Sequence, residues 1–206
     1  MAHSEAIRCA HDLLSESQFN VAHHGPRAAY GVRPPVLLVS GARHYSVTKA
    51  ADVLGLGRQN VRLVDIDPMF RLDVRALDAE IRRTVRDSML PLGVVAIAGT
   101  PELGAVDPVD RIAELREETG RTLGESFWLH VDAAWGGYFR SLFTGAEAEA
   151  DDAGEFVSRE LTIKRGRYSK HLLLKWGSRE VHAAFQAFPC AESITVDPHK
   201  MGYVPY

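Results

Sequence analysis

The sequence predicts a three-layer α/β fold in which helices cover both faces of a mainly parallel β-sheet. Short apolar runs alternate with amphipathic stretches from residue 34 onward, and this strand–helix–strand order is typical of parallel sheets. The run 93–99, GVVAIAG, is apolar throughout and bounded by glycine, as expected of a strand that is buried on both faces. The chain has 206 residues, which is long enough to bury a core without a disulfide or metal staple.

The predicted elements follow one another along the chain. Besides 93–99, β-rich runs predict strands over 35–40 and 61–66, and strands that lead into turns over 127–137 and 193–200. Apolar residues at helical spacing predict helices over 44–57, 74–85, 108–120 and 178–188. We expect Asp73 to cap the second helix and Gly120 to end the third, which begins at Pro108.

Two stretches fall outside this alternation. Residues 15–33 lack periodicity and are predicted to form a loop. Residues 141–177 contain an acidic run followed by a basic one, and we expect them to form an irregular insertion. Because the chain stops just beyond a strand-like run, we expect residues 1–206 to form one incomplete domain.

Charge, composition and cysteine usage argue against several classes of protein. The 24 Lys and Arg against 27 Asp and Glu, a formal net charge of −3, argue against a dedicated nucleic-acid binder. No apolar run approaches the roughly 20 residues of a membrane-spanning helix, and residues 1–14 carry His and Glu where a secretory signal is apolar. Neither the two cysteines nor the histidines have metal-ligand spacing, so no metal site is predicted. We expect a cytoplasmic protein that binds neither nucleic acid nor membrane.

Two predicted strand ends carry charged residues where open α/β sheets bind ligands. Asp132 ends a buried strand and is followed by Ala133, Ala134 and two glycines, which would let a flat ligand approach the backbone. The alternative is that Asp132 caps a turn. Lys200 follows a β-rich run, where desolvation would favour the neutral amine, a nucleophile toward an aldehyde. The alternative is an ordinary surface lysine.

Two further loops after strands carry weaker candidates. His44 lies at a strand-to-helix junction, where its imidazole could stack on a ring or cap the helix. Thr100 lies in a glycine turn after the strand 93–99, where its hydroxyl could bind a ligand or hold the loop. The stretch 55–60, GLGRQN, lacks the third glycine of a dinucleotide-binding fingerprint and is better explained as a helix end.

Taken together, the order and spacing of these residues are specific. The stretches HYSVTKAADVLGLG (44–57), LGAVDPVDRI (103–112), WLHVDAAWGGY (128–138) and 180–206 resemble the group II pyridoxal-phosphate decarboxylases of fold type I. Within that group the resemblance is strongest to the bacterial tyrosine decarboxylases. It covers about residues 35–140 and 178–206, and it implies the large, cofactor-binding domain of that fold type.

The resemblance implies four residues around the cofactor ring. Lys200 would hold pyridoxal phosphate as a Schiff base, and Asp132 would pair with its pyridine nitrogen, which keeps the ring an electron sink. His44 would stack on one face of the ring, and Ala134 would pack on the other face, where only a small side chain fits.

Three more residues would complete the site, with Lys200, His44 and His199 as its catalytic residues. His199 would lie beside the Schiff base and the phosphate, Thr100 would line the cofactor pocket, and Asp197 would lie near the phosphate. Many relatives have a second Thr where this chain has Pro101, and many have Asn at the position of Asp197.

The implied reaction is decarboxylation of L-tyrosine or another aromatic amino acid to the amine and CO₂, by a homodimer. The alternatives are a glutamate or aspartate decarboxylase, another fold-type-I reaction such as transamination or aldol cleavage, and a truncated relic without activity. The resemblance also implies that the family's N-terminal phosphate-binding loop and C-terminal small domain are missing from residues 1–206.

Overall fold

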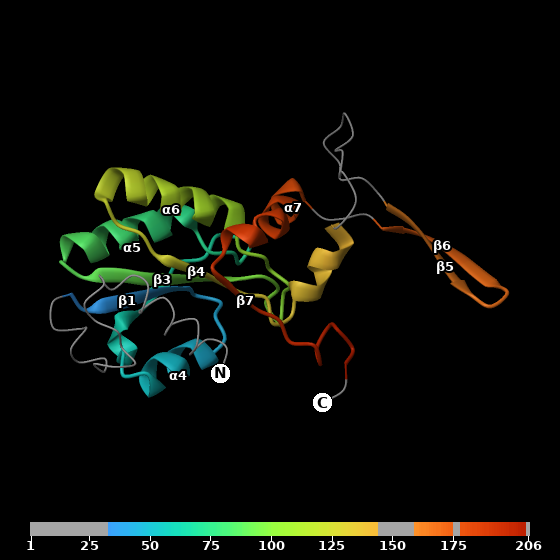
Figure 1. Ribbon diagram of the computed structural model, residues 1–206, viewed down its shortest axis with the longest axis horizontal. Helices are drawn as coiled ribbons and strands as arrows, with labels where there is room; N and C mark the ends of the chain where they lie inside the picture. Colours follow the sequence, from blue (N-terminus) through green and yellow to red (C-terminus); the bar gives the residue numbers. More distant parts are fainter. Residues whose placement is uncertain (1–32, 144–158, 175–177, 205–206) are drawn as a thin grey trace.

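The computed structural model describes residues 33–143, 159–174 and 178–204, and it confirms the predicted α/β architecture (Figure 1). Five strands form one sheet in the order β2-β1-β3-β4-β7, and every neighbouring pair is parallel. The strands are β1 (Pro35–Ser40), β2 (Val61–Val64), β3 (Leu90–Ile97), β4 (Trp128–Asp132) and β7 (Ser193–Thr195). Of the predicted loop 15–33, residues 15–32 lie outside the described part of the chain.

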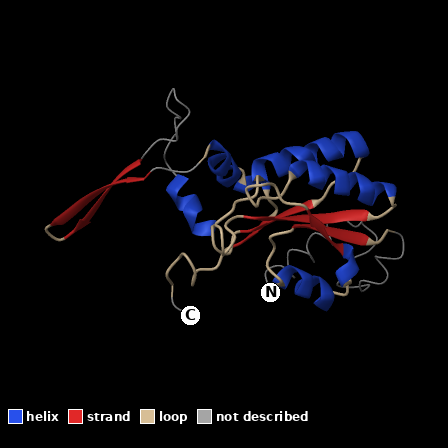
Figure 2. Cartoon of the chain, turned by 180° about the vertical axis from the view of Figure 1, so that it is seen from behind, coloured by secondary structure: helices blue, strands red, loops and turns tan. Residues whose placement is uncertain are grey.

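Helices cover both faces of the sheet, as predicted. They are α4 (Ser46–Val53), α5 (Val74–Arg86), α6 (Val109–Leu123) and α7 (Arg179–Gln186), with short 3₁₀ helices η1 (Arg58–Asn60), η2 (Gly137–Phe143) and η3 (Phe188–Cys190). Figures 1 and 2 show α5, α6 and α7 on one face and α4 on the other. Within the described residues, no helix is long and apolar enough to cross a membrane.

The alternation of side chains along β1 divides the core into two clusters. Val36 and Leu38 are buried in the cluster that includes residues of α5, α6 and α7. Leu37 and Val39 point the other way and belong to the cluster around α4. Successive residues of a strand face opposite sides of the sheet, which explains why β1 is apolar at consecutive positions.

Two helix ends test the capping predictions. The Asp73 side chain accepts hydrogen bonds from Arg75 N (2.8 Å) and Ala76 N (3.3 Å), which confirms it as the N-cap of α5. The predicted end of the next helix at Gly120 is wrong, because α6 continues to Leu123 and ends at Gly124, which has φ 67°. A glycine can lie inside a helix at a cost of about 1 kcal/mol, whereas the left-handed C-cap strongly favours one.

Strand β3 begins three residues before its predicted start. Pro91 lies inside it, opposite Val36 of β1, and the pairing then shifts so that Gly93 lies opposite Leu37. Proline lacks the N–H that a regular ladder requires, and a bulge is one of the few places in a sheet that accepts it.

The expectation of an irregular insertion over 141–177 is wrong for residues 159–174. These form an antiparallel hairpin of β5 (Arg159–Arg165) and β6 (Tyr168–Leu174), with Gly166 at φ 59° in the turn. The Gly-containing turn and the β-forming residues around it are a hairpin signal that the high charge of the stretch concealed. Residues 144–158 and 175–177 lie outside the described part of the chain.

Candidate active site

All seven sequence-predicted site residues follow strands at the carboxyl edge of the sheet. His44 follows β1, Thr100 follows β3, Asp132 ends β4 with Ala134 just beyond it, and Asp197, His199 and Lys200 follow β7. Strand β7 pairs with β4 in parallel, and Thr195 lies opposite Asp132. The structure therefore places the lysine loop beside the aspartate loop, at the edge where open α/β sheets bind ligands.

The Lys200 amine is held by two interactions. Its Nζ lies 2.7 Å from Asp197 Oδ2, in an ion pair within one turn of chain. The same atom lies 5.4 Å from the centroid of the Trp135 ring, which belongs to the loop after β4. The second contact extends the lysine toward the loop that Asp132 begins.

Backbone hydrogen bonds tie the loops after β4 and β7 together around Asp132. The buried Asp132 side chain accepts a hydrogen bond from Ala134 N at 3.2 Å, so one carboxylate oxygen turns the chain after the strand. Ala133 N donates to Thr195 O (3.0 Å), and Asp197 N donates to Ala134 O (3.4 Å). The turn-capping alternative for Asp132 is thus part of what the structure shows.

The glycines after β4 pack against protein backbone and side chains. A Cβ on Gly136 would lie 2.2 Å from Ala98 O, and one on Gly137 would lie 2.6 Å from Val196 Cγ2. Gly136 N also donates to Ala98 O at 3.0 Å. These glycines let the loops after β3, β4 and β7 approach one another. This packing is enough to explain why glycine occurs here, without a ligand that approaches the backbone.

The Gly136→Ala substitution should lower the free energy of unfolding by at least about 2 kcal/mol, because the new methyl group must displace backbone. Gly120→Ala is the matched control, since its Cβ would meet nothing closer than 3.7 Å, inside α6. Alanine there should stabilise the chain by up to about 1 kcal/mol. Urea unfolding of both variants checks the prediction, and equal effects would contradict it.

His44 makes its polar contacts within its own loop. Ser46 N donates to Nδ1 at 3.3 Å, and Ser46 Oγ lies 2.8 Å from the same nitrogen. The ring lies 4.3 Å from the Tyr45 ring, tilted by 42°. These contacts fit the helix-capping alternative, and stacking on a cofactor stays a prediction.

Thr100 serves the loop in which it lies. Its buried Oγ1 accepts a hydrogen bond from Ala105 N at 3.0 Å, and its backbone N donates to Ala105 O at 3.1 Å. Its carbonyl accepts a hydrogen bond from Gly104 N at 2.8 Å. The hydroxyl therefore holds the turn after β3, and any contact with a ligand would be additional.

Sequence reasoning missed a hydrogen-bonded network beneath Asp132. Trp128 Nε1 donates to Ser193 Oγ (2.7 Å), which lies 2.8 Å from His130 Nδ1, while His130 Nε2 lies 3.2 Å from Thr195 Oγ1. Trp128, His130 and Asp132 share one face of β4, so their spacing of two is the signal that could have found it. The network locks β4 to β7 just below the two strand ends that carry Asp132 and the lysine loop.

The Ser193→Ala substitution should cost about 1–3 kcal/mol of unfolding free energy, because it removes the oxygen shared by Trp128 and His130. Ser169→Ala, in the exposed hairpin, is the control and should change it by less than about 0.5 kcal/mol. Urea titrations compare the two, and a Ser193 variant as stable as the control would show that the network contributes nothing.

A second missed residue, Asp107, lies buried behind the loop after β3. Its Oδ1 accepts a hydrogen bond from Leu72 N and its Oδ2 accepts one from Ile97 N, both at 2.7 Å. Burial raises the pKa of this carboxyl to about 7, although those two backbone hydrogen bonds lower it. Asp107 thus joins β3 to the segment that enters α5.

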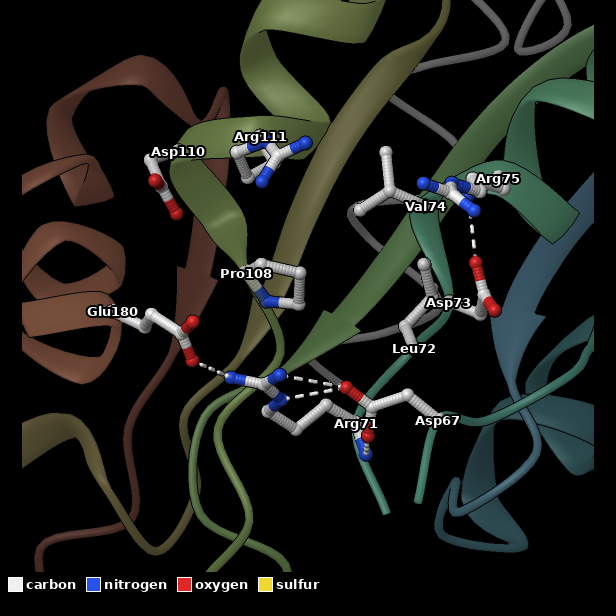
Figure 3. A pocket seen from close by; sticks show the side chains of 10 residues that line it. All are labelled: Asp67, Arg71, Leu72, Asp73, Val74, Arg75, Pro108, Asp110, Arg111 and Glu180. Atoms are coloured by element: carbon white, nitrogen blue, oxygen red, sulfur yellow. Dashed lines mark hydrogen bonds and ion pairs between the residues drawn. The ribbon is translucent and has the colours of Figure 1, made fainter. Parts of the chain in front are cut away.

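A pocket of about 410 Å³ opens beside Asp107, among the first residues of α5, α6 and α7 (Figure 3). Arg71 crosses it, with Nη2 2.7 Å from Asp67 Oδ2 and Nη1 paired with Glu180. Burial by itself raises the pKa of Asp67, but hydrogen bonds from Arg71 and Met69 outweigh it and lower the pKa. The ten lining residues include none of the predicted site residues. Among the described residues, no group of three or more His, Cys, Asp or Glu could hold a metal ion.

Comparison with known proteins finds a matching family and similar proteins. The model of the family described as the pyridoxal-dependent decarboxylase conserved domain matches residues 17–150. An L-tyrosine decarboxylase of Levilactobacillus brevis is 43% identical over 172 residues, which are 82% of this chain and 26% of that protein. A probable L-tyrosine/L-aspartate decarboxylase of Methanothermobacter thermautotrophicus is 31% identical over 206 residues, 98% of this chain and 43% of that protein.

A solved structure matches as well. The mouse protein CSAD in its apo form superimposes with a TM-score of 0.65 at 27% identity, covering 98% of this chain and 33% of its own. The chain thus spans between about a quarter and under half of the length of these relatives. The family model covers more than half of this chain, which confirms the resemblance seen in the sequence. The chain belongs to the pyridoxal-dependent decarboxylase family, whose cofactor is pyridoxal phosphate.

Proposed function

We propose that this chain is the cofactor-binding part of an enzyme that decarboxylates L-tyrosine to tyramine and CO₂. The observation that carries the proposal is the pairing of β4 with β7, which sets the loop of Asp132 beside the loop of Lys200. The extension of the Lys200 amine over Trp135 supports it further. A carboxylate and an amine on neighbouring loops of one sheet edge would suit the two ends of a pyridoxal ring.

The residues present fit pyridoxal phosphate by their chemistry. Lys200 Nζ would bind its aldehyde, and the buried Asp132 carboxylate would pair with its protonated pyridine nitrogen, where a low local dielectric strengthens the attraction. His44 and Ala134 would enclose the ring, and Thr100 would line the pocket. The bound group supplies the electron sink that lets the amino acid lose CO₂.

Lys200 would have to leave its ion pair with Asp197 to bind the aldehyde of the cofactor. Asp197 would then lie near the phosphate, as the family resemblance implies. His199 lies in the same turn and is the remaining proposed catalytic residue.

The substrate class rests on the relatives. Tyrosine is the substrate named for the Levilactobacillus relative, at the higher identity. Aspartate is named together with tyrosine for the archaeal relative, so decarboxylation of an acidic amino acid is the second candidate. A homodimer and a cytoplasmic location belong to the same proposal.

Borohydride reduction tests the cofactor assignment. The full chain is incubated with pyridoxal phosphate, reduced and digested, and the phosphopyridoxyl group is located by mass spectrometry. We expect the label on Lys200. Label spread over exposed lysines such as Lys49 and Lys164, with none on Lys200, would overturn the assignment.

Product analysis tests the reaction. The chain loaded with cofactor is incubated with L-tyrosine, L-DOPA, L-glutamate and L-aspartate, and the amines are quantified by chromatography. Tyramine is the expected product, whereas β-alanine from aspartate would favour the second candidate. A folded chain that is labelled at Lys200 and forms no amine would show that it binds the cofactor without catalysing the reaction.

A further inference from the structure

The β5–β6 hairpin is exposed along most of its length. Figures 1 and 2 show it extending away from the sheet and its covering helices. Residues 162–171 are all exposed. An isolated two-stranded hairpin is at best marginally stable in water, so a surface that covers this one would stabilise it.

The two faces of the hairpin differ in character. The register pairs Thr162 with His171, whose side chains lie 3.0 Å apart (Oγ1 to Nδ1), on a polar face. It pairs Ile163 with Lys170 on the opposite face, together with Tyr168. The side chains of Ile163 and Tyr168 are 52% and 76% exposed. One face of the hairpin is thus apolar and aromatic, and nothing in the described chain covers it.

The hairpin is also strongly basic. Residues 159–174 contain five Lys and Arg and one Glu, a net charge of +4 in a chain whose total is −3. The apolar face carries Arg165 and Lys170 beside Ile163 and Tyr168. A surface that covers this face must therefore combine apolar side chains with carboxylates.

The chain itself presents such a surface in the segment 65–70, DIDPMF, which we call the Asp65–Phe70 loop. Met69 and Phe70 are 68% and 51% exposed. The loop also contains the exposed Asp65, and Asp67, which is paired with Arg71. Asp67 Oδ1 accepts hydrogen bonds from Met69 N (2.8 Å) and Arg71 N (2.9 Å), which fix the shape of the loop.

The backbone of this loop is strained in a way that displays its apolar residues. Phe70 has φ 60°, a left-handed conformation that costs a bulky residue about 1–2 kcal/mol. Strain of this kind persists where the surrounding structure fixes it, and it is concentrated at functional surfaces. Here the Asp67 hydrogen bonds fix it, and the result is an exposed phenyl ring beside carboxylates.

We propose that the apolar, basic face of the β5–β6 hairpin docks on the Asp65–Phe70 loop of a second copy of this chain. Ile163 and Tyr168 would cover Met69 and Phe70, and Lys170 with Arg165 would meet the carboxylate of the exposed Asp65. The hairpin extends away from the sheet of its own copy (Figure 1), and the opposite charges of hairpin and loop favour a second copy as the occupant. This inference rests on the proposed homodimer and is independent of the proposed reaction.

Matched charge reversals on the two faces of the hairpin test the docking. Lys170→Glu, on the apolar face, and Ile163→Ser should each raise the dimer dissociation constant at least about tenfold in sedimentation equilibrium. Lys164→Glu makes the same charge change on the polar face and should alter it by less than about threefold. Equal weakening by Lys170→Glu and Lys164→Glu would overturn the docking, since it would reflect overall charge alone.

Cross-linking identifies the occupant. The photoreactive residue benzoylphenylalanine replaces Tyr168, and ¹⁴N-labelled and ¹⁵N-labelled copies are mixed before illumination. We expect mixed-isotope cross-links to peptides that contain residues 65–71. Cross-links within one copy, including those to the acidic run 147–155, would overturn the proposal, and so would a dimer joined elsewhere. Borohydride labelling of Lys200 in the Lys170→Glu variant separates the two proposals, because it should persist when the dimer is lost.

Discussion

Replacement of Lys200 by alanine should abolish covalent binding of pyridoxal phosphate. The variant removes the amine that extends over Trp135 beside the Asp132 loop, and no other described site residue carries a primary amine. The Schiff-base absorbance of the wild-type chain should disappear, and mass spectrometry after borohydride reduction should find no label in the peptide 196–206.

Two control variants separate chemistry from charge at this position. Lys200→Arg keeps a positive charge that can pair with Asp197 but cannot bind an aldehyde, so it should also lose the label while keeping the stability of the wild type within about 0.5 kcal/mol. Lys164→Ala, on the exposed hairpin, should leave the label on Lys200 intact. A Lys200→Ala variant that still binds the cofactor covalently would remove Lys200 from the proposed mechanism.

The Asp107→Ala substitution should destabilise the chain by about 4 kcal/mol. It leaves Leu72 N and Ile97 N buried without the acceptor that each now has at 2.7 Å, and an orphaned buried donor costs about 1–3 kcal/mol. Asp107→Asn keeps one acceptor oxygen and should lose less. Asp78→Ala, which breaks an exposed pair with Arg82, is the control and should cost under about 1 kcal/mol.

The raised pKa of Asp107 also predicts how stability changes with pH. The folded chain holds this proton up to about pH 7, whereas the unfolded carboxyl releases it near its ordinary value of 3.8. The folded state binds more protons over that interval, so this residue's contribution to stability falls as pH rises from about 4 to 7 and is constant beyond both ends. The slope is at most about 1.4 kcal/mol per pH unit.

Urea unfolding at pH 5 and pH 7.5 measures this contribution as the difference between the wild type and Asp107→Asn. The stability advantage of the wild type over Asp107→Asn should shrink at the higher pH. A difference that grows with pH would mean that the two backbone hydrogen bonds outweigh burial, and that the carboxyl is ionised throughout the neutral range.

The sequence was sufficient to predict the sheet, its helices and the sheet edge at which the candidate site residues lie. Apolar runs such as 93–99 identify buried strands, and the carboxyl ends of parallel strands meet at one edge, so Asp132 and Lys200 could be assigned to that edge. The family resemblance then supplied a role for each residue, which spacing alone could not do.

What the sequence did not reveal depends on tertiary contacts. The partners of Asp107 are two backbone N–H groups from separate segments, which leave no trace in residue spacing. The network of His130 with Ser193 joins strands 63 positions apart in the chain. The hairpin 159–174 was missed because its many charged residues concealed the pattern of its two strands.

Strand β7, which leads into the Lys200 turn, has only three residues and pairs with β4 at the border of the described sheet. Once the hydrogen bonds of Ser193 with Trp128 and His130 break, such a strand can detach while β1 and β3 stay paired in the interior, because opening it exposes little apolar surface. A preparation could therefore give a native far-UV circular dichroism spectrum and a cooperative melting curve although β7 has lost the register that sets Thr195 opposite Asp132. Hydrogen exchange at Ile194 would measure the fraction of molecules in which β7 is detached. Probes that report on the whole fold do not detect this fraction.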